Sequence, residues 1–136
     1  MLPTDMKAYN RKLIEEFRAN GGPEPKDRQL LLLTTTGART GEPRTTPMMY
    51  IPDGDRLLVI PSNSGAPHHP DWYHNLVAHP DVTVEVADET YQARAVVPQG
   101  AERDRLFAEV SEKFPFFADH QAKISRTIPV VILERL

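Results

Sequence analysis

The sequence predicts an α+β domain in which mainly antiparallel strands are joined in hairpins and helices are inserted between the hairpins. Short apolar or alternating segments follow one another across single turns, and helical segments separate pairs of strands instead of alternating with each strand. Strands arranged in this way often close into a small barrel, which removes exposed edges. The length of 136 residues suits one domain, so we expect residues 1–136 to form a single unit.

The first predicted element is an amphipathic helix over residues 4–19, with Thr4 as its N-cap. Apolar side chains recur at helical spacing, at Met6, Tyr9, Leu13, Ile14 and Phe17. Two glycines and two prolines in residues 20–27 end the helix. Its mixed charges favour a helix that caps the barrel, and contacts with a membrane surface or a second copy of the chain stay open.

Three consecutive antiparallel strands are predicted next. QLLLLTTT (29–36) is a continuous apolar run with threonines, and PRTTPMMYI (43–51) follows a glycine turn. RLLVIPS (56–62) comes after Asp53-Gly54, a pair typical of a tight hairpin turn.

The second half of the chain predicts two helices, a hairpin and a last strand. A short helix is expected after Pro70 and before Pro80, and a longer one over GAERDRLFAEVSEKF (100–114). Between them, DVTVEVADETYQARAVVP (81–98) alternates about a turn at Asp88-Glu89, which predicts a half-buried hairpin. TIPVVILERL (127–136) closes the chain as a strand, and Pro129 is expected to restrict its start to an edge or a bulge.

The composition excludes several classes of function. Lys and Arg total 16 against 19 Asp and Glu, a formal charge of −3, so no general positive field attracts nucleic acid. The absence of cysteine excludes disulfides and thiol chemistry and is compatible with a reducing cytoplasm. No segment has the pattern of a signal peptide or the roughly 20 apolar residues of a membrane span. We therefore expect a cytoplasmic protein with at most a peripheral membrane contact.

The turn between the first two strands is a candidate anion site. Gly37 and Gly41 bracket Arg39 and Thr40, and Arg44 follows at the start of the next strand. The N–H groups of such a turn can face inward as a nest, while the arginines supply positive charge. Taken alone, a turn of this composition is more often a solvated hairpin.

A second candidate is the loop PSNSGAPHHPDWYHNL (61–76). Ser62, Ser64 and Gly65 could present hydroxyl and amide groups to an anion beside the positive end of the following helix. Without a ligand this is a flexible polar loop, and Trp72 and Tyr73 are by themselves more typical of packing residues.

Metal and nucleotide motifs are not present. His68, His69 and His74 lie close in sequence, but their spacing does not place a ligand pair on one helix face, so no metal site is predicted. Neither G-x-S-x-G, G-x-G-x-x-G nor G-x-x-x-x-G-K-[ST] occurs. Serine hydrolase, Rossmann and P-loop classes are therefore disfavoured.

Taken together, several segments resemble the deazaflavin-dependent nitroreductase family, the F420H2-dependent oxidoreductases of mycobacteria and other actinobacteria. These are LLTTTGARTGEPRTTPMMY, PSNSGAPHHPDWYHNLVAHPDVTVEV and RTIPVVIL, which keep the family's order and spacing over residues 30–133. The resemblance implies a split β-barrel that binds the deazaflavin F420, whose tail carries a phosphodiester and an oligoglutamate chain. It also implies hydride transfer from F420H2 to an electron-poor small molecule such as a quinone, an enone or a nitro compound.

The resemblance also implies a set of cofactor-binding residues. The turn and the following Pro-Arg would hold the phosphate and tail through Gly37, Arg39, Thr40, Gly41 and Arg44, and the next strand would run beside the ring with Thr46, Pro47 and Met48. The second loop would contribute Ser62, Asn63, Ser64, Gly65 and Ala66, and the short helix would wall the pocket with Trp72, Tyr73, Asn75 and Leu76.

The chain departs from the family pattern at three places. Ala38 stands where the turn usually has a further cation, and Asn63 stands where the second loop usually has a lysine, so the hold on a polyanionic tail should be weaker. In FPFFADHQ the family carries tyrosines over the substrate, whereas this chain has Phe114, Phe117 and His120. His120 is the candidate proton donor, because the unperturbed pKa of histidine lies near neutrality; the alternative is an ordinary exposed histidine at a helix end.

Two other functions stay open. Split barrels also bind FMN, and the reduced tail charge would suit that cofactor. Alternatively, the protein binds or sequesters F420 without turnover.

Overall fold

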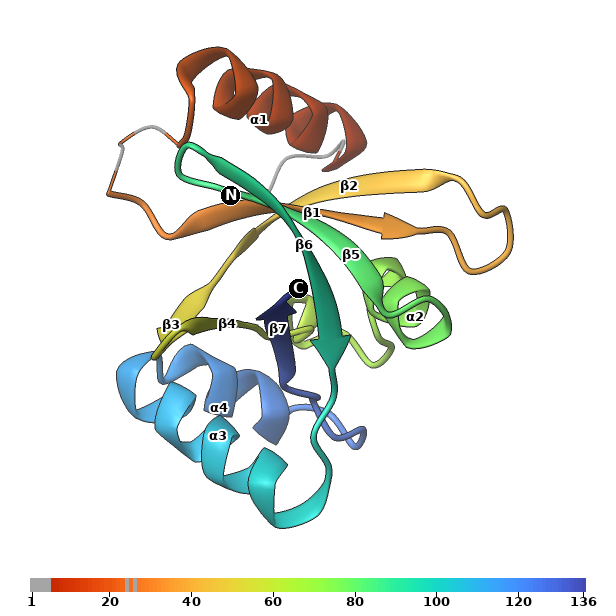
Figure 1. Ribbon diagram of the computed structural model, residues 1–136. Coiled ribbons are helices and arrows are strands. Elements are labelled where there is room, and N and C mark those ends of the chain that lie inside the picture. Colours follow the sequence, from red (N-terminus) through yellow and green to blue (C-terminus); the bar gives the residue numbers. More distant parts are fainter. Residues whose placement is uncertain (1–5, 24, 26) are drawn as a thin grey trace.

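An antiparallel sheet curls into a half-barrel, and the helices are arranged around it (Figure 1). The computed structural model describes residues 6–23, 25 and 27–136. Within these, the strands are β1 (Leu30–Thr36), β2 (Pro43–Met49), β3 (Ile51–Asp53), β4 (Arg56–Val59), β5 (Asp81–Val86), β6 (Glu89–Val96) and β7 (Val131–Arg135). The helices are α1 (Met6–Asn20), α2 (Asp71–Ala78), α3 (Gly100–Lys113) and α4 (Phe116–Ala122), with a short turn η1 (Asn63–Gly65). The predicted N-cap Thr4 lies outside the described residues.

The sheet has the strand order β2-β1-β5-β6-β7-β4-β3, so the two edge strands are neighbours in the chain. The prediction of a single strand over residues 43–51 is wrong, because the chain leaves one edge and enters the other at Tyr50. β2 pairs only with β1, while β3 pairs with β4. The break falls where the chain passes between two core clusters: Met48 packs against one and Ile51 belongs to the other. The result is a barrel that is split between β2 and β3.

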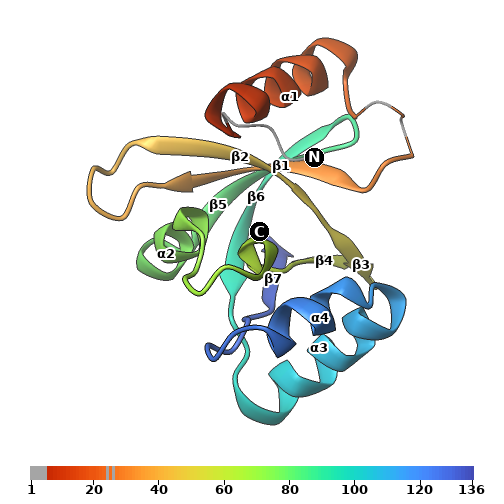
Figure 2. The ribbon, with the colours of Figure 1, turned by 180° about the vertical axis from the view of Figure 1, so that it is seen from behind.

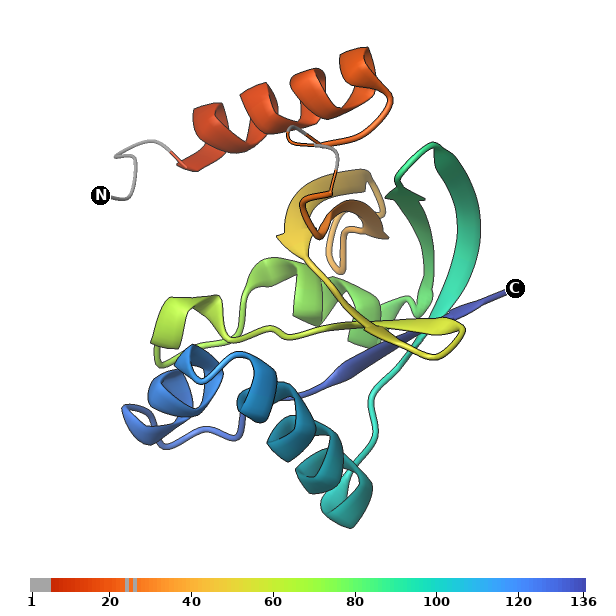
Figure 3. The same cartoon turned by 90° about the vertical axis from the view of Figure 1, so that its left-hand side faces the viewer.

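The run of leucines in β1 is buried on both faces of the sheet. Leu31 and Leu33 point into the main core inside the curled sheet, and Leu30 and Leu32 pack against Phe17 of α1. Because successive side chains of a strand alternate between faces, a continuous apolar run needs cover on both sides. α1 supplies that cover, as Figure 3 shows, so the expected capping role of this helix is confirmed.

The last strand is an interior strand and not the edge that Pro129 suggested. β7 pairs with β6 on one side and with β4 on the other. This is possible because the strand begins at Val131, after the proline, so no ladder hydrogen bond is lost. The two faces of the segment are again both buried, with Val131 and Leu133 in one cluster and Val130 and Ile132 in the other, beneath α3 and α4.

Two predicted hairpins and two predicted helices are confirmed. β3 and β4 are joined at Gly54-Asp55, one residue later than the predicted turn, and β5 and β6 at Ala87-Asp88, one residue earlier than predicted. α2 follows Pro70 and lies beneath the tip of the β1–β2 hairpin (Figure 2). In the described ranges, no helix is long and apolar enough to cross a membrane.

Candidate functional site

The β1–β2 turn is closed by hydrogen bonds within itself. The amides of Gly37 and Gly41 donate to Glu42 O and Gly37 O at 2.8 and 2.9 Å, and the Glu42 amide donates to Thr40 Oγ1 at 3.2 Å. A Cβ at Gly37 would lie 2.6 Å from Thr40 Oγ1 and 3.2 Å from Glu42 O, so a larger residue would have to displace the Thr40 side chain. These amides are occupied, so the expected nest of free N–H groups does not form at Gly37, Gly41 and Glu42.

The arginines of this turn extend into solvent. Arg39 and Arg44 are both exposed, so their charges are accessible to an anion in solution. The Arg44 guanidinium is also 3.6 Å from the Glu42 carboxylate, and both side chains are more than half exposed. An exposed ion pair of this kind contributes little to stability, but the carboxylate competes with any anion for Arg44.

Asn75 ties the turn to α2. Its side-chain oxygen accepts a hydrogen bond from the Ala38 amide at 3.0 Å, and its side-chain nitrogen donates to Thr35 Oγ1 at 3.2 Å. Asn75 and Thr35 are both buried, so each of these groups would be costly to leave unpaired. The sequence placed Asn75 in the cofactor pocket, whereas its described polar contacts position the turn.

The loop at residues 62–66 adopts an uncommon backbone conformation. Asn63, Ser64 and Gly65 have φ values of 51°, 54° and 81°, three consecutive residues in the left-handed region. For the two residues that carry a side chain, this conformation is strained and persists only when the surroundings enforce it. The Asn63 side chain contributes by donating to His68 O at 3.1 Å, so the residue that replaces the family's lysine closes the loop.

Arg126 holds this loop from the other side. Its guanidinium donates to three backbone oxygens of the loop segment, those of Pro61, Ser62 and Ala66, at 3.4, 2.9 and 3.1 Å. It also donates to His69 Nδ1 at 3.0 Å. The sequence pattern assigned no role to Arg126, because nothing local indicates a contact that spans about 60 residues.

The contact with Arg126 fixes the state of His69. Since Nδ1 accepts a hydrogen bond from a cation, the ring must be neutral, with its proton on Nε2. Burial lowers the pKa of His69, and the nearby charges of Arg126 and His74 lower it further. The ring stacks on Tyr73 at a centroid distance of 4.6 Å, which joins the loop to α2.

His120 lies against the 62–66 loop. A Cβ at Gly65 would be 3.5 Å from His120 Cδ2, so the imidazole packs directly on this glycine. His120 Nδ1 is buried and has no hydrogen-bond partner among the described residues. Nε2 is therefore the nitrogen left to exchange a proton. The sequence predicted His120 as a proton donor, and the structure places it beside the candidate cofactor loop.

Two residues predicted in the pocket are core residues. Leu76 is 1% exposed and Phe117 is 5% exposed, so neither side chain offers surface to a ligand. Both side chains lie on the helix faces that pack against the sheet, Leu76 in one core cluster and Phe117 in the other. Phe116, which the sequence did not select, is 42% exposed and stacks on Phe117 at 4.3 Å, beside His120. The remaining predicted residues, Thr46, Pro47, Met48, Trp72, Tyr73 and Phe114, are half-buried.

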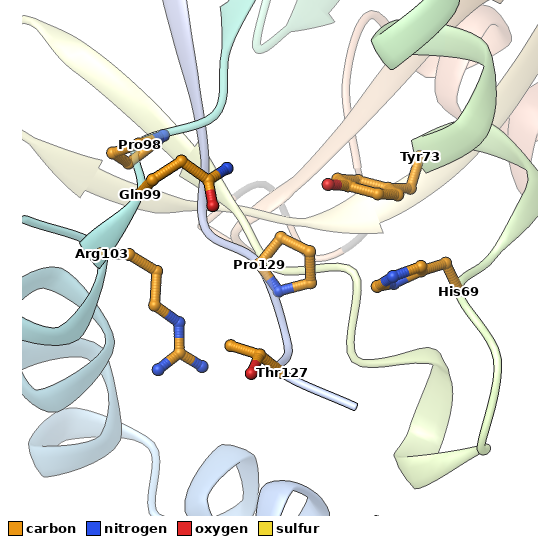
Figure 4. A pocket seen from close by; sticks show the side chains of 7 residues that line it. All are labelled: His69, Tyr73, Pro98, Gln99, Arg103, Thr127 and Pro129. Carbon is orange, nitrogen blue, oxygen red and sulfur yellow. The ribbon is translucent and has the colours of Figure 1, made fainter. Parts of the chain in front are cut away.

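A small cavity of about 110 Å³ is lined by His69 and Tyr73 and by residues at the starts of α3 and β7. Figure 4 shows His69 and Tyr73 on one side and Gln99 and Arg103 on the other, with Pro129 between them. The Arg103 guanidinium donates to Ile128 O, Gln121 and Asp104. Of the predicted cofactor residues, only Tyr73 lines this cavity. In the described part of the chain, no three His, Asp or Glu side chains gather as metal ligands.

Comparisons with known proteins place this arrangement in a family. Residues 9–135 match the family described as F420H(2)-dependent quinone reductase. The chain belongs to this family. A Mycobacterium tuberculosis protein named F420H(2)-dependent quinone reductase is 44% identical over 108 residues, which cover 77% of this chain and 72% of the relative. The predicted membership of the F420H2-dependent oxidoreductases is therefore confirmed.

Similar solved structures confirm the predicted α+β split barrel. The F420-H2 dependent reductase FDR-A superposes with a TM-score of 0.71 at 36% identity, over 79% of this chain and 95% of that one. A structure described as a domain-swapped dimer has a TM-score of 0.73 at 32% identity, over 96% of this chain and all of that one. The heme storage protein HutZ of Vibrio cholerae, at 19% identity, shares the fold alone.

We predict that Asn75→Leu lowers the free energy of unfolding by about 2 kcal/mol, because it leaves the Ala38 amide without its partner and removes the hydrogen bond that Thr35 Oγ1 accepts. Thr35→Val keeps the Ala38–Asn75 hydrogen bond but removes both the bond from Asn75 and the long bond from Thr35 Oγ1 to Arg44 O at 3.5 Å, and should cost about 1 kcal/mol. Urea denaturation of the three proteins measures both values. Equal losses for the two variants would show that the Ala38–Asn75 hydrogen bond does not anchor the turn.

Proposed function

We propose that this protein is an F420H2-dependent reductase that transfers hydride to a quinone, with enones and nitro compounds as further candidate acceptors. The observation that carries the proposal is the family match over residues 9–135. Support comes from the two predicted loops, which are both attached to α2: the β1–β2 turn through Asn75, and the 62–69 segment through the stacking of His69 on Tyr73.

The residues at this site suit an anionic cofactor. Arg39 and Arg44 offer exposed positive charge at the hairpin tip, and the 62–66 loop offers a fixed backbone surface held by Arg126. Reduced F420, when bound, supplies the hydride. We propose that Arg39 and Arg44 would hold its phosphate and tail, and that β2, with Thr46, Pro47 and Met48, and the loop, with Ser62, Ser64 and Ala66, would flank its ring.

His120 and the aromatic cluster beside it would complete the substrate side. The ring lies on Gly65, so a substrate at the loop would come within reach of His120 Nε2. That nitrogen can donate a proton to an oxygen that gains negative charge during reduction. Phe116 presents apolar ring surface next to His120, and Phe114 adjoins Phe116, so the cluster suits a quinone and helps to exclude water.

The test is a fluorescence titration of the purified protein with F420, followed by turnover of F420H2 with a water-soluble quinone. We expect saturable binding at micromolar cofactor and quinone-dependent oxidation. No binding at that concentration would refute the proposal. A yellow protein that retains FMN would favour the alternative cofactor, and binding without turnover of any acceptor would favour a sequestering role.

We predict that Arg44→Ala weakens F420 binding about tenfold at low salt and less at high salt, because it removes a charge-assisted contact with the tail. Arg39→Ala should have a smaller effect of the same kind. Glu42→Gln should strengthen binding about twofold, because the competing carboxylate is gone. Titrations at two salt concentrations measure all three dissociation constants.

Arg105→Ala is the matched control for the arginine variants, since Arg105 is as exposed as Arg44 and also pairs with a glutamate, but lies on α3. It should leave F420 binding unchanged. The tail assignment fails if Arg44→Ala binds like the wild type or if Arg105→Ala weakens binding to the same degree.

We predict that His120→Gln lowers kcat for quinone reduction by about 100-fold, the usual contribution of a general acid, while the F420 dissociation constant stays within about twofold. His79→Gln, an exposed histidine at the end of α2, is the control and should not change kcat. Steady-state kinetics with saturating F420H2 measures the effect. An unchanged kcat in His120→Gln would assign proton donation to solvent or to another group.

A further inference from the structure

We propose that Arg126 is a positioning residue that holds the 61–69 segment in its binding conformation, and that protonation of His69 releases this hold. The proposal rests on the proposed function in one respect, namely that the 62–66 loop contacts F420. It adds a residue and a pH response that the family match does not assign. Arg126 itself touches neither cofactor nor substrate in this scheme and acts through the loop.

The first support is the distribution of the hydrogen bonds. One guanidinium donates to carbonyl oxygens at the start of the loop, Pro61 and Ser62, and at its end, Ala66. It therefore fixes the distance between the two ends of the loop. A lysine at this position could not reproduce the pattern, because its single nitrogen cannot reach carbonyls on both sides in a planar fork.

The segment that carries Arg126 is itself anchored. Gln121 of α4 donates to Arg126 O at 2.7 Å and accepts from the Ile128 amide at 2.8 Å. The Arg103 guanidinium donates to Ile128 O at 2.6 and 2.9 Å. Arg126 thus connects the loop to a segment that is itself fixed to α3, α4 and the start of β7.

The second support is the strain in the loop. Asn63 and Ser64 occupy left-handed conformations that cost free energy for residues with a side chain. Local hydrogen bonds from Gly65 to Ser62 O and from Ala66 to Asn63 O close the turn but cross only three residues. The hydrogen bonds from Arg126, by contrast, connect this loop to a segment about 60 residues away in the sequence. Their loss should let the loop relax to a conformation in which the surface beside His120 is changed.

The third support is that His69 shares the Arg126 guanidinium. Nδ1 of His69 accepts from Arg126 only while the ring is neutral. A proton on Nδ1 removes the acceptor and places two positive charges in contact. The titratable or charged groups around the ring are Arg126 before β7, His74 and Tyr73 of α2, His68 of the same loop and Arg103 across the cavity. Among these, no carboxylate is present to stabilise the imidazolium.

The direction of the pH response follows from this arrangement. Burial and the neighbouring charges of Arg126 and His74 lower the pKa of His69 in the folded protein. The folded state therefore binds this proton less readily than the unfolded chain, whose histidine titrates near 6.5. The stabilising contact is fully present above that value and is lost as the pH falls through the lower pKa of the folded state. F420 binding should weaken in the same range.

The experiment compares four variants with the wild type: Arg126→Met, Arg126→Lys, His69→Asn and Arg56→Met. Arg56→Met is the control for general destabilisation, because Arg56 is a half-buried arginine that pairs with Asp53 in the β3–β4 hairpin. His69→Asn keeps a side-chain acceptor near the position of Nδ1 but cannot titrate. F420 dissociation constants are measured in steps from pH 8 down to the lowest pH at which the wild type stays folded, and thermal unfolding shows which variants are folded.

We expect Arg126→Met and Arg126→Lys to weaken F420 binding at pH 8 by about tenfold or more, and Arg56→Met to leave it within twofold. As the pH falls through the pKa of His69 in the folded protein, the wild type should lose about tenfold in affinity beyond any loss seen in His69→Asn. The proposal is overturned if Arg126→Lys binds like the wild type, if Arg56→Met weakens binding equally, or if His69→Asn keeps the full pH dependence.

A readout without cofactor separates this proposal from the proposed function. The ¹H NMR signal of the His69 ring, assigned with His69→Asn, gives its titration in the free protein. In Arg126→Met this titration should move to higher pH, because the cation is gone. If the wild type binds no F420 but the titration moves, the proposed function fails and the Arg126–His69 coupling holds; an unmoved titration overturns the coupling whatever binds.

Discussion

The site depends on the hydrogen bonds from Arg126 to the backbone of residues 61–66. A guanidinium is suited to this task because it is planar, always charged at neutral pH and carries several donors in a fixed fork. It is partly desolvated here, which lowers its pKa but also strengthens each of its hydrogen bonds. Without such a cation, the carbonyls of Pro61, Ser62 and Ala66 would turn to solvent and the left-handed loop would have little to enforce it.

α2 connects this loop to the other half of the site. The helix begins directly after His69-Pro70, and its buried Asn75 binds the β1–β2 turn through the Ala38 amide. The two loops are about 25 residues apart in sequence, yet one short helix fixes both. Side chains within each loop contribute as well: Asn63 closes the 62–66 loop by donating to His68 O, and Glu42 pairs with Arg44 in the turn.

Much of the fold could be predicted because its signals are local. The four leucines of β1, the Asp53-Gly54 pair and the alternation in β5 and β6 each specify a strand or a turn through periodicity alone. The break at Tyr50 could not, because it arises from the passage of one chain between two core clusters. Helix orientation is also set by tertiary packing. The sequence therefore assigned Leu76 and Phe117 to a pocket, although both are buried, and did not select the exposed Phe116. Arg126 was missed because its partners lie about 60 residues away.

The measurement that tests the account most directly is a crystal structure of the protein with F420 bound. The account predicts the phosphate and tail along Arg39 and Arg44, and the ring between β2 and the 62–66 loop. The hydrogen bonds from Arg126 to Pro61, Ser62 and Ala66 should be unchanged from the structure described here. A cofactor seated in the cavity of His69, Tyr73 and Arg103, or a loop that opens away from Arg126 to receive the ring, would contradict it.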